Sequence, residues 1–203
     1  MAMVPTKGNL IIAKNTLALC ETGYGLLDKK RNILIREMMK LIDNAKEIQD
    51  KIETTFSEAY SALQQANIDI GIDTVEKIGL AIDIEDSLDV KFRSVMGVEL
   101  PEISIEKTDR HNYYGLNETN SQLDEAYIQF DRVKYLTVEL AQIESNVMRL
   151  ADAIKKTQKR TNALSNIMIP KFTSTIKFIS DALDEKERED FSRLKVIKRQ
   201  KTE

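Results

Sequence analysis

Apolar residues recur at alternating steps of three and four through the first third of the chain. The repeat begins at Leu10, ends at Ala66, and places apolar residues at fifteen of its seventeen positions. A straight α-helix drifts against a strict seven-residue repeat, so the pattern predicts a left-handed supercoil with a partner helix. A helix of this length would measure roughly 90 Å. The predicted seam positions are Leu10, Ala13, Leu17, Cys20, Tyr24, Leu27, Arg31, Leu34, Met38, Leu41, Ala45, Ile48, Ile52, Thr55, Ala59, Ala62 and Ala66.

A second repeat of the same kind begins near Leu123 and runs toward the C-terminus. It changes phase after Leu140, which locally unwinds a supercoil. Pro170 lies inside this repeat and lacks a backbone donor, so we expect a kink there rather than the end of the helix. Asn117 or Thr119 is expected to cap the start of this helix. The seam positions are Leu123, Ala126, Phe130, Val133, Thr137, Leu140, Ile143, Val147, Leu150, Ile154, Thr157, Thr161, Leu164, Met168, Phe172, Ile176, Ile179 and Leu183.

Between the two repeats the seven-residue spacing disappears and four of the seven glycines occur. Apolar and charged residues alternate over 88–95, which predicts a half-buried strand, and Gly97 can reverse the chain. A short helix is expected over Thr74–Ala81. The predicted fold is therefore mainly α: a long antiparallel two-helix left-handed coiled coil with a small central insert of a short helix and a β-hairpin. The predicted divisions are a long helix in 1–66, the insert in 67–117 and a second long helix in 118–203.

Composition and charge exclude several classes of function. Charged residues make up 31% of the chain and aromatic residues 6%, which suits long solvated helices. A net charge of −3 gives no strong field for nucleic acid or acidic membranes. No apolar run is long enough to insert in a bilayer and no signal peptide begins the chain. The single cysteine, Cys20, is expected at the seam of a protein from a reducing, cytoplasmic compartment.

The motifs of common enzymes are missing from the sequence. It contains no phosphate-binding loop, no dinucleotide fingerprint and no zinc-binding pair of histidines or cysteines. The only histidine, His111, stands alone in a polar stretch and is expected to be a solvated loop residue, since metal and catalytic sites need several converging groups. We therefore predict a protein without catalytic activity, cofactor or metal.

Two clusters of cations predict a partner-binding layer. If residues near 66 face residues near 123, position 30 faces a position near 159, so both clusters occupy one level of the coiled coil. Such cations repel one another unless an acidic surface lies nearby. The alternative is that they are solvated patches on a helical surface. This basic belt comprises Lys29, Lys30, Arg31, Lys155, Lys156, Lys159 and Arg160.

A second set of apolar residues, off the main seam, lies at intervals of seven. Its continuation beyond residue 33 is polar, so the first helix has two apolar stripes only near the chain terminus. Exposed apolar stripes mark contact surfaces. This flank is therefore expected to bind an outside partner, unless the end of the second helix covers it. This apolar column comprises Ile12, Leu19, Leu26 and Ile33.

Several segments resemble the D subunit of the V/A-type rotary ATPases. The C-terminal third is the most specific, and Asp28 and Ser165 depart from the pattern in place of an expected Lys and Glu. The segments are Pro5-Thr-Lys-Gly-Asn-Leu, Tyr24-Gly-Leu-Leu-Asp-Lys-Lys-Arg, Met96-Gly-Val-Glu-Leu-Pro, Lys156-Thr-Gln-Lys-Arg-Thr-Asn-Ala-Leu-Ser-Asn-Ile-Met-Ile-Pro-Lys, Thr175-Ile-Lys-Phe-Ile and Leu183-Asp-Glu-Lys-Glu-Arg-Glu-Asp-Phe-Ser-Arg-Leu-Lys.

The resemblance implies a central-stalk rotor shaft that transmits torque between the catalytic A/B hexamer and the membrane ring during ATP-coupled proton or sodium transport. Both chain ends would lie inside the hexamer. The hairpin end would bind the small F subunit of the stalk and rest on the subunit that caps the membrane ring, so the protein would be peripheral to the inner face of the cell membrane. Two alternatives are a structural coiled-coil adaptor and a nucleic-acid-binding hairpin. The negative net charge argues against nucleic acid as a partner.

Overall fold

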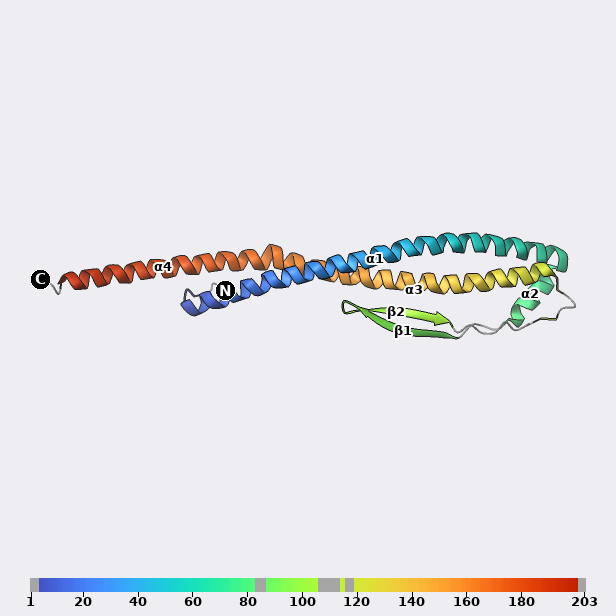
Figure 1. The fold of residues 1–203 in the computed structure, drawn as a ribbon, viewed down its shortest axis with the longest axis horizontal. Coiled ribbons are helices and arrows are strands. Elements are labelled where there is room, and N and C mark those ends of the chain that lie inside the picture. Colours follow the sequence, from blue (N-terminus) through green and yellow to red (C-terminus); the bar gives the residue numbers. More distant parts are fainter. Residues whose placement is uncertain (1–3, 83–86, 106–113, 116–118, 201–203) are drawn as a thin grey trace. The chain divides into compact units, whose positions relative to one another are not determined.

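The computed structural model describes residues 4–82, 87–105, 114–115 and 119–200. The chain divides into two compact units, which we call the first unit (Met1–Ile33 with Ile154–Glu203) and the second unit (Leu34–Ala153). Its elements confirm the predicted fold class of two long helical segments around a short helix and a β-hairpin (Figure 1). In order they are α1 (Lys7–Ile70), α2 (Ile72–Ala81), β1 (Leu88–Val95), β2 (Val98–Ile105), α3 (Ser121–Ala163), the π-helical segment η1 (Leu164–Met168) and α4 (Ile169–Gln200).

Helix α1 is continuous because its sequence offers a cap at each end and no break between them. The Thr6 hydroxyl accepts a hydrogen bond from the Asn9 amide at 3.2 Å, which satisfies a free donor of the first turn. Gly71 ends the helix with a φ of 96°, a conformation that glycine adopts without strain. Every buried residue of α1 lies on the predicted seam. These residues are Ala13, Cys20, Leu34, Ile48, Ala59, Ala62 and Ala66.

The cap of α3 differs from the predicted one. The Asn120 side-chain oxygen accepts a hydrogen bond from the Leu123 amide at 2.9 Å, so Asn120 is the N-cap. The Thr119 hydroxyl instead donates to the Gly115 carbonyl at 3.4 Å. Asn117 lies outside the described residues. An asparagine one position later thus reaches the third amide of the helix, which is the geometry that a cap needs.

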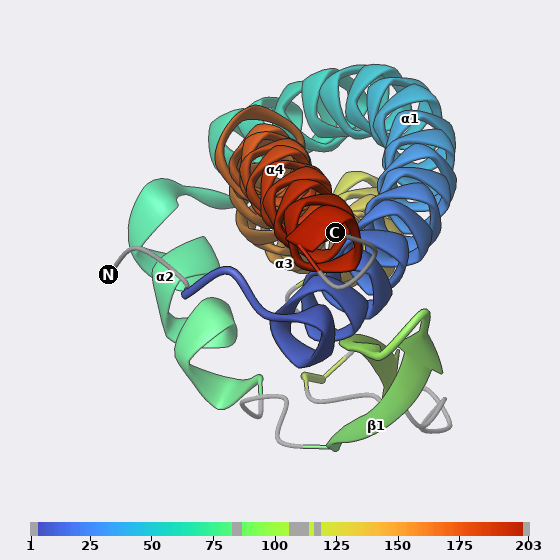
Figure 2. The same cartoon turned by 90° about the vertical axis from the view of Figure 1, so that its left-hand side faces the viewer.

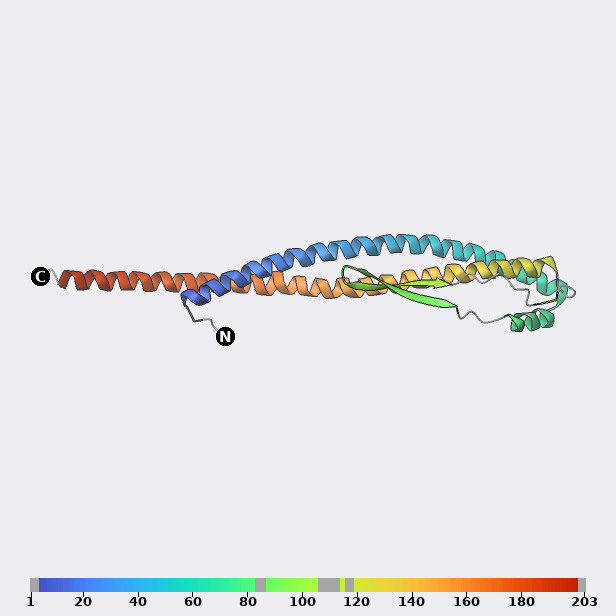
Figure 3. The same ribbon diagram turned by 60° about the horizontal axis from the view of Figure 1, so that its bottom comes forward.

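In the second unit, residues 34–70 of α1 and 121–153 of α3 lie side by side and antiparallel (Figures 1 and 3). Asn120 donates to the Asp69 carboxylate at 3.0 Å where the two segments meet. Most of the buried α3 residues lie on the predicted seam, but Thr137 is exposed and two buried polar residues, Gln129 and Asn146, were not predicted there. The seam is therefore less regular on α3 than on α1.

The hairpin joins β1 and β2 through a two-residue turn at Met96 and Gly97, with φ values of 51° and 74°. Two positive values of φ suit the twist of adjacent strands, and glycine reduces the strain at one of them. The strands pair antiparallel from Val95 opposite Val98 to Leu88 opposite Ile105. Leu100 and Pro101 of β2 are buried, whereas β1 is exposed in seven of its eight residues, so the prediction that the strand over 88–95 is half-buried is wrong. The hairpin thus rests on the unit through β2.

Helix α2 follows α1 after Gly71 and covers an apolar groove in the second unit. The groove has a volume of about 230 Å³ and is lined from α1, α2 and α3. Its lining includes Leu63 of α1, Ile78 of α2 and Tyr127 of α3. Figure 2 shows α2 and the hairpin as separate projections, so the insert consists of two small attachments rather than one folded body.

In the first unit the second long helical segment continues through Pro170, as predicted. The departure from α-helical geometry is the π turn of η1, in which the Ile169 amide donates to the Leu164 carbonyl. A proline has no N–H, and its ring clashes with the carbonyl four residues earlier, so a wider turn before Pro170 relieves both problems. The sequence carries a trace of this turn, since Leu164, Met168 and Phe172 follow one another at steps of four.

Candidate interaction surface

The structure gathers all the predicted contact residues in the first unit. Arg31 Nη1 donates to Gln158 Oε1 at 2.9 Å, so position 31 faces position 158, which confirms the predicted register. Two sequence segments more than a hundred residues apart therefore meet at this level. The belt residues of α1 and α3 consequently form one layer around the helix pair.

The charges of the basic belt face solvent. Lys29, Lys155, Lys156, Lys159 and Arg160 are exposed, and Lys30 is half-buried. Within the part of the chain that the structure describes, none of these six side chains forms an ion pair. An acidic surface would therefore be attracted to these exposed cations.

Arg31 differs from the other belt residues because it lies half-buried on the seam. Its Nη2 lies 2.6 Å from the Asp28 carboxylate, and its Nη1 bonds Gln158 on the opposite helix. Gln158 in turn donates to Asn162 at 2.7 Å. The guanidinium is therefore bound within the unit, where it joins the two helices.

The apolar column is uncovered over most of its length. Ile12, Leu19 and Leu26 are 55%, 72% and 64% exposed. Ile33 is half-buried. Within the single chain, α4 does not cover this flank, so the first three side chains form a stripe available to another protein. Their spacing of seven keeps them on one side of α1.

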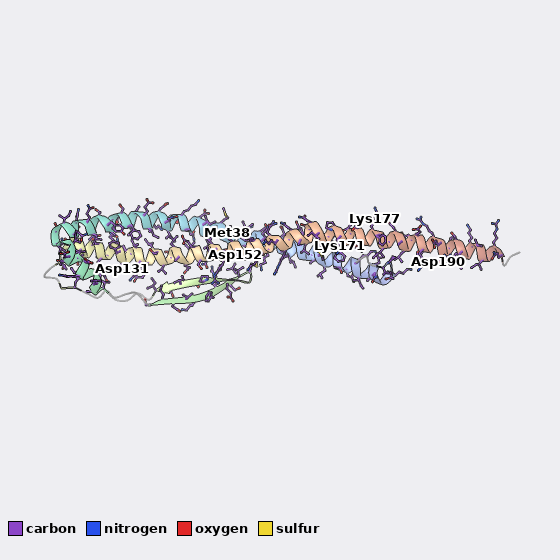
Figure 4. All side chains as sticks on the ribbon, turned by 180° about the vertical axis from the view of Figure 1, so that it is seen from behind. Met38, Asp131, Asp152, Lys171, Lys177 and Asp190 are labelled. Atoms are coloured by element: carbon purple, nitrogen blue, oxygen red, sulfur yellow. The ribbon has the colours of Figure 1, made fainter. Side chains whose placement is uncertain are left out.

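The structure also shows an exposed helical surface at the end of α4, whose residues the sequence analysis did not single out as contact residues. Every residue from Asp184 to Gln200 is exposed, and α4 runs past the beginning of α1 (Figures 1 and 3). We call residues 184–200 the C-terminal extension. Figure 4 shows side chains projecting around it, with Asp190 labelled. Phe191, Leu194 and Ile197 are 66%, 65% and 50% exposed and follow one another at steps of three, so they lie on one side of the helix.

Register alone could have revealed the C-terminal extension. With Gln158 opposite Arg31, the start of α1 lies opposite residues near position 182, so later residues have no helix to face. Near the start of α1, Lys7 and Glu187 form an exposed ion pair, with their charged atoms 2.9 Å apart. Their hydrogen bond raises the pKa of Lys7 and lowers the pKa of Glu187, because each charge stabilises the other.

Other kinds of site are not formed by the described residues. Within them, no three His, Cys, Asp or Glu side chains are grouped so that they could hold a metal ion. Cys20 is buried at the seam, and His111 lies outside the described part of the chain. None of the described helices is long and apolar enough to cross a membrane.

Comparison with known proteins finds D subunits of ATP synthases, which match nearly the full chain. The family model for the D subunit of ATP synthase matches residues 9–199. The V-type ATP synthase D subunit of Thermotoga neapolitana is 46% identical, covering 98% of both chains. The A-type ATP synthase D subunit of Methanobrevibacter smithii is 38% identical over 96% of this chain and 85% of its own. That of Thermococcus kodakarensis is 36% identical over 96% of this chain and 92% of its own.

Proposed function

The chain belongs to the family of ATP synthase D subunits, and on that basis we propose that it is the central-stalk rotor shaft of a V/A-type ATPase. In this role it transmits torque between the catalytic A/B hexamer and the membrane ring, coupling ATP synthesis or hydrolysis to proton or sodium transport. It acts without catalysing a reaction itself, as a peripheral component at the inner, cytoplasmic face of the cell membrane.

The observation that supports this role best is the concentration of exposed apolar and basic surface in the first unit. The apolar column, the basic belt and the C-terminal extension all belong to it. An isolated helix the length of the extension is marginally stable in water, so it needs a partner to remain ordered. A sleeve of A and B subunits closed around the first unit would cover all three surfaces at once.

The second unit would then lie outside the sleeve, where the remaining partners bind. Its seam-forming helices carry the hairpin and α2, the two attachments that interrupt the coiled-coil pattern. We assign the small F subunit to the coiled coil beside the hairpin, and the ring-capping subunit to the end where α1 turns into α2. Both assignments rest on the family and on the position of the insert in the sequence.

Turnover measurements test the proposal directly. The isolated chain should hydrolyse no ATP, because its sequence has no phosphate-binding loop. Added to a purified A/B hexamer, it should convert the hexamer to sustained, cooperative hydrolysis. ATP hydrolysis by the isolated chain that a point mutation within it abolished would contradict the shaft role.

Reversal of the basic belt should weaken binding to the hexamer. We expect Lys156, Lys159 and Arg160 replaced together by Glu to lower the affinity by at least about tenfold at low salt, since like charges juxtaposed across an interface are strongly unfavourable. The loss should shrink as salt screens the charges. Affinity is measured at two ionic strengths with the A/B hexamer alone.

A matched control changes the same net charge elsewhere. Lys46, Lys51 and Lys77 are exposed in the second unit and form no ion pair among the described residues. Their replacement by Glu should leave hexamer affinity unchanged. Equal losses in both triple variants would show that net charge, rather than the position of the belt, controls binding.

A further inference from the structure

The β-hairpin is attached to α3 by side chains that bond to the backbone of β2. The Ile103 amide donates to Gln142 Oε1 at 2.6 Å, and Arg149 Nη1 donates to the Glu99 carbonyl at 3.2 Å. The Arg149 guanidinium also lies 5.5 Å from the centre of the Phe92 ring. Figures 1 and 3 show the hairpin alongside α3. Two side chains on one face of α3 thus bond to β2 at Glu99 and at Ile103, the two ends of its docked part.

The strand register explains why these bonds reach the backbone. A two-residue turn makes Val95 and Val98 a hydrogen-bonded pair, and such pairs alternate with non-hydrogen-bonded ones. Glu99, Pro101 and Ile103 therefore all direct their backbone groups away from β1. Pro101 interrupts no bond of the hairpin at such a position. It also offers no N–H to α3, so the middle of the docked edge lacks a donor.

Asn146 lies on α3 between Gln142 and Arg149. It lies four residues after Gln142 and three before Arg149, which places it on the same helix face. Its side chain is 6% exposed, and its Oδ1 atom is buried without a hydrogen-bond partner. A buried carbonyl without a donor loses its bonds to water and gains nothing in return. Because Asn146 lies on the helix face where β2 docks, its unpaired oxygen makes docking of the hairpin less favourable.

We propose that the hairpin moves between a docked and a released position on α3. Gln142 and Arg149 are the positioning residues that hold it docked, and the unpaired Oδ1 atom of Asn146 keeps docking weak. The exposure of β1 is consistent with this, since only β2 is buried against the rest of the unit. The inference concerns the second unit of the chain by itself, so it stands independently of the proposed function.

Two backbone amides report the two processes separately in the full-length chain. The Ile103 amide bonds to Gln142 and points away from β1, so its hydrogen exchange reports release of the hairpin. The Leu100 amide belongs to the hydrogen-bonded pair with Arg93, so its exchange reports opening of the hairpin itself. Exchange of both amides is measured by NMR, and circular dichroism confirms that each variant keeps its helices.

The variants have opposite expected effects. Arg149→Ala removes a holding bond and should speed exchange of Ile103 roughly fivefold, with Leu100 changed by less than about twofold. Asn146→Leu removes the unpaired carbonyl and should slow exchange of Ile103 by a similar factor. Arg36→Ala is the control, because Arg36 is an exposed arginine of the same unit without a bond among the described residues.

Two results would overturn the proposal. Ile103 exchange that is unchanged in Arg149→Ala would show that this residue does not hold the hairpin. Faster Ile103 exchange in Asn146→Leu would show that the amide supports docking. If the leucine variant loses helicity, Asn146→Val gives the same comparison with a smaller side chain, and the arginine variant remains an independent test.

Discussion

A chain ending at Leu183 should fold normally and fail to sustain turnover of the A/B hexamer. Residues 184–200 are all exposed, and the ion pair of Glu187 with Lys7 is exposed as well, so their removal should cost the coiled coil little stability. Burial of Phe191, Leu194 and Ile197 in a sleeve would contribute about 1.5–3 kcal/mol for each side chain. We therefore expect hexamer affinity to fall by more than about a hundredfold.

The measurements are thermal unfolding by circular dichroism and hexamer binding with ATP turnover. A full-length variant with Phe191, Leu194 and Ile197 replaced by Ser should reproduce the binding defect, which separates the apolar stripe from chain length. Ser192→Ala with Lys195→Ala on the same extension is the control and should bind normally. A large drop in the unfolding temperature of the truncated chain would place the extension in the folding core instead.

Alanine substitutions of two leucines in α1 should have different effects, one on the stability of the chain and the other on its binding to the hexamer. Leu34 is fully buried at the seam, so Leu34→Ala should lower the free energy of unfolding by about 2–5 kcal/mol. Leu26 is 64% exposed in the apolar column, so Leu26→Ala should change stability by less than about 0.5 kcal/mol. In the hexamer, however, Leu26→Ala should weaken binding, because the side chain would be buried there.

Urea unfolding measures the first effect and hexamer affinity the second. The same chemical change is made on one helix, so helix propensity contributes equally to both variants. Equal destabilisation by the two substitutions would mean that the column is covered in the free protein. Normal hexamer binding by Leu26→Ala would remove the column from the proposed contact.

The predictions that succeeded rest on periodicity, which depends on many residues at once. Every buried residue of α1 lies on the predicted seam, because a strict heptad repeat places its apolar residues on the one side of the helix that faces the partner helix. The position of the insert predicted which residues of the two long helices lie opposite each other, and the bond between Arg31 and Gln158 confirms that register. The hairpin reversal at Gly97 followed from local turn chemistry.

The features that the sequence could not reveal depend on contacts between distant polar residues. Gln142 and Arg149 look like solvated helix residues until β2 is placed beside them. Asn146 is polar and off the predicted repeat, so its burial has no signal in the periodicity. The cap at Asn120 required a choice among adjacent polar residues, which pattern alone does not make. Whether the basic belt and apolar column bind a partner depends on the partner's surface.

The bond between Arg31 and Gln158 has a mechanical consequence for the first unit. A heptad repeat restores its apolar contacts after a slide of seven residues, so it offers several nearly equivalent rest positions along the helix axis. A slide of one heptad would bring Ala151 or Ser165 opposite Arg31; Ala151 has no acceptor, and the Ser165 hydroxyl is on a much shorter side chain than the Gln158 amide. The half-buried charge would then lose its partner on the facing helix, which is costly. The bond to Gln158 therefore favours one rest position of the two helices and opposes a slide along their axis.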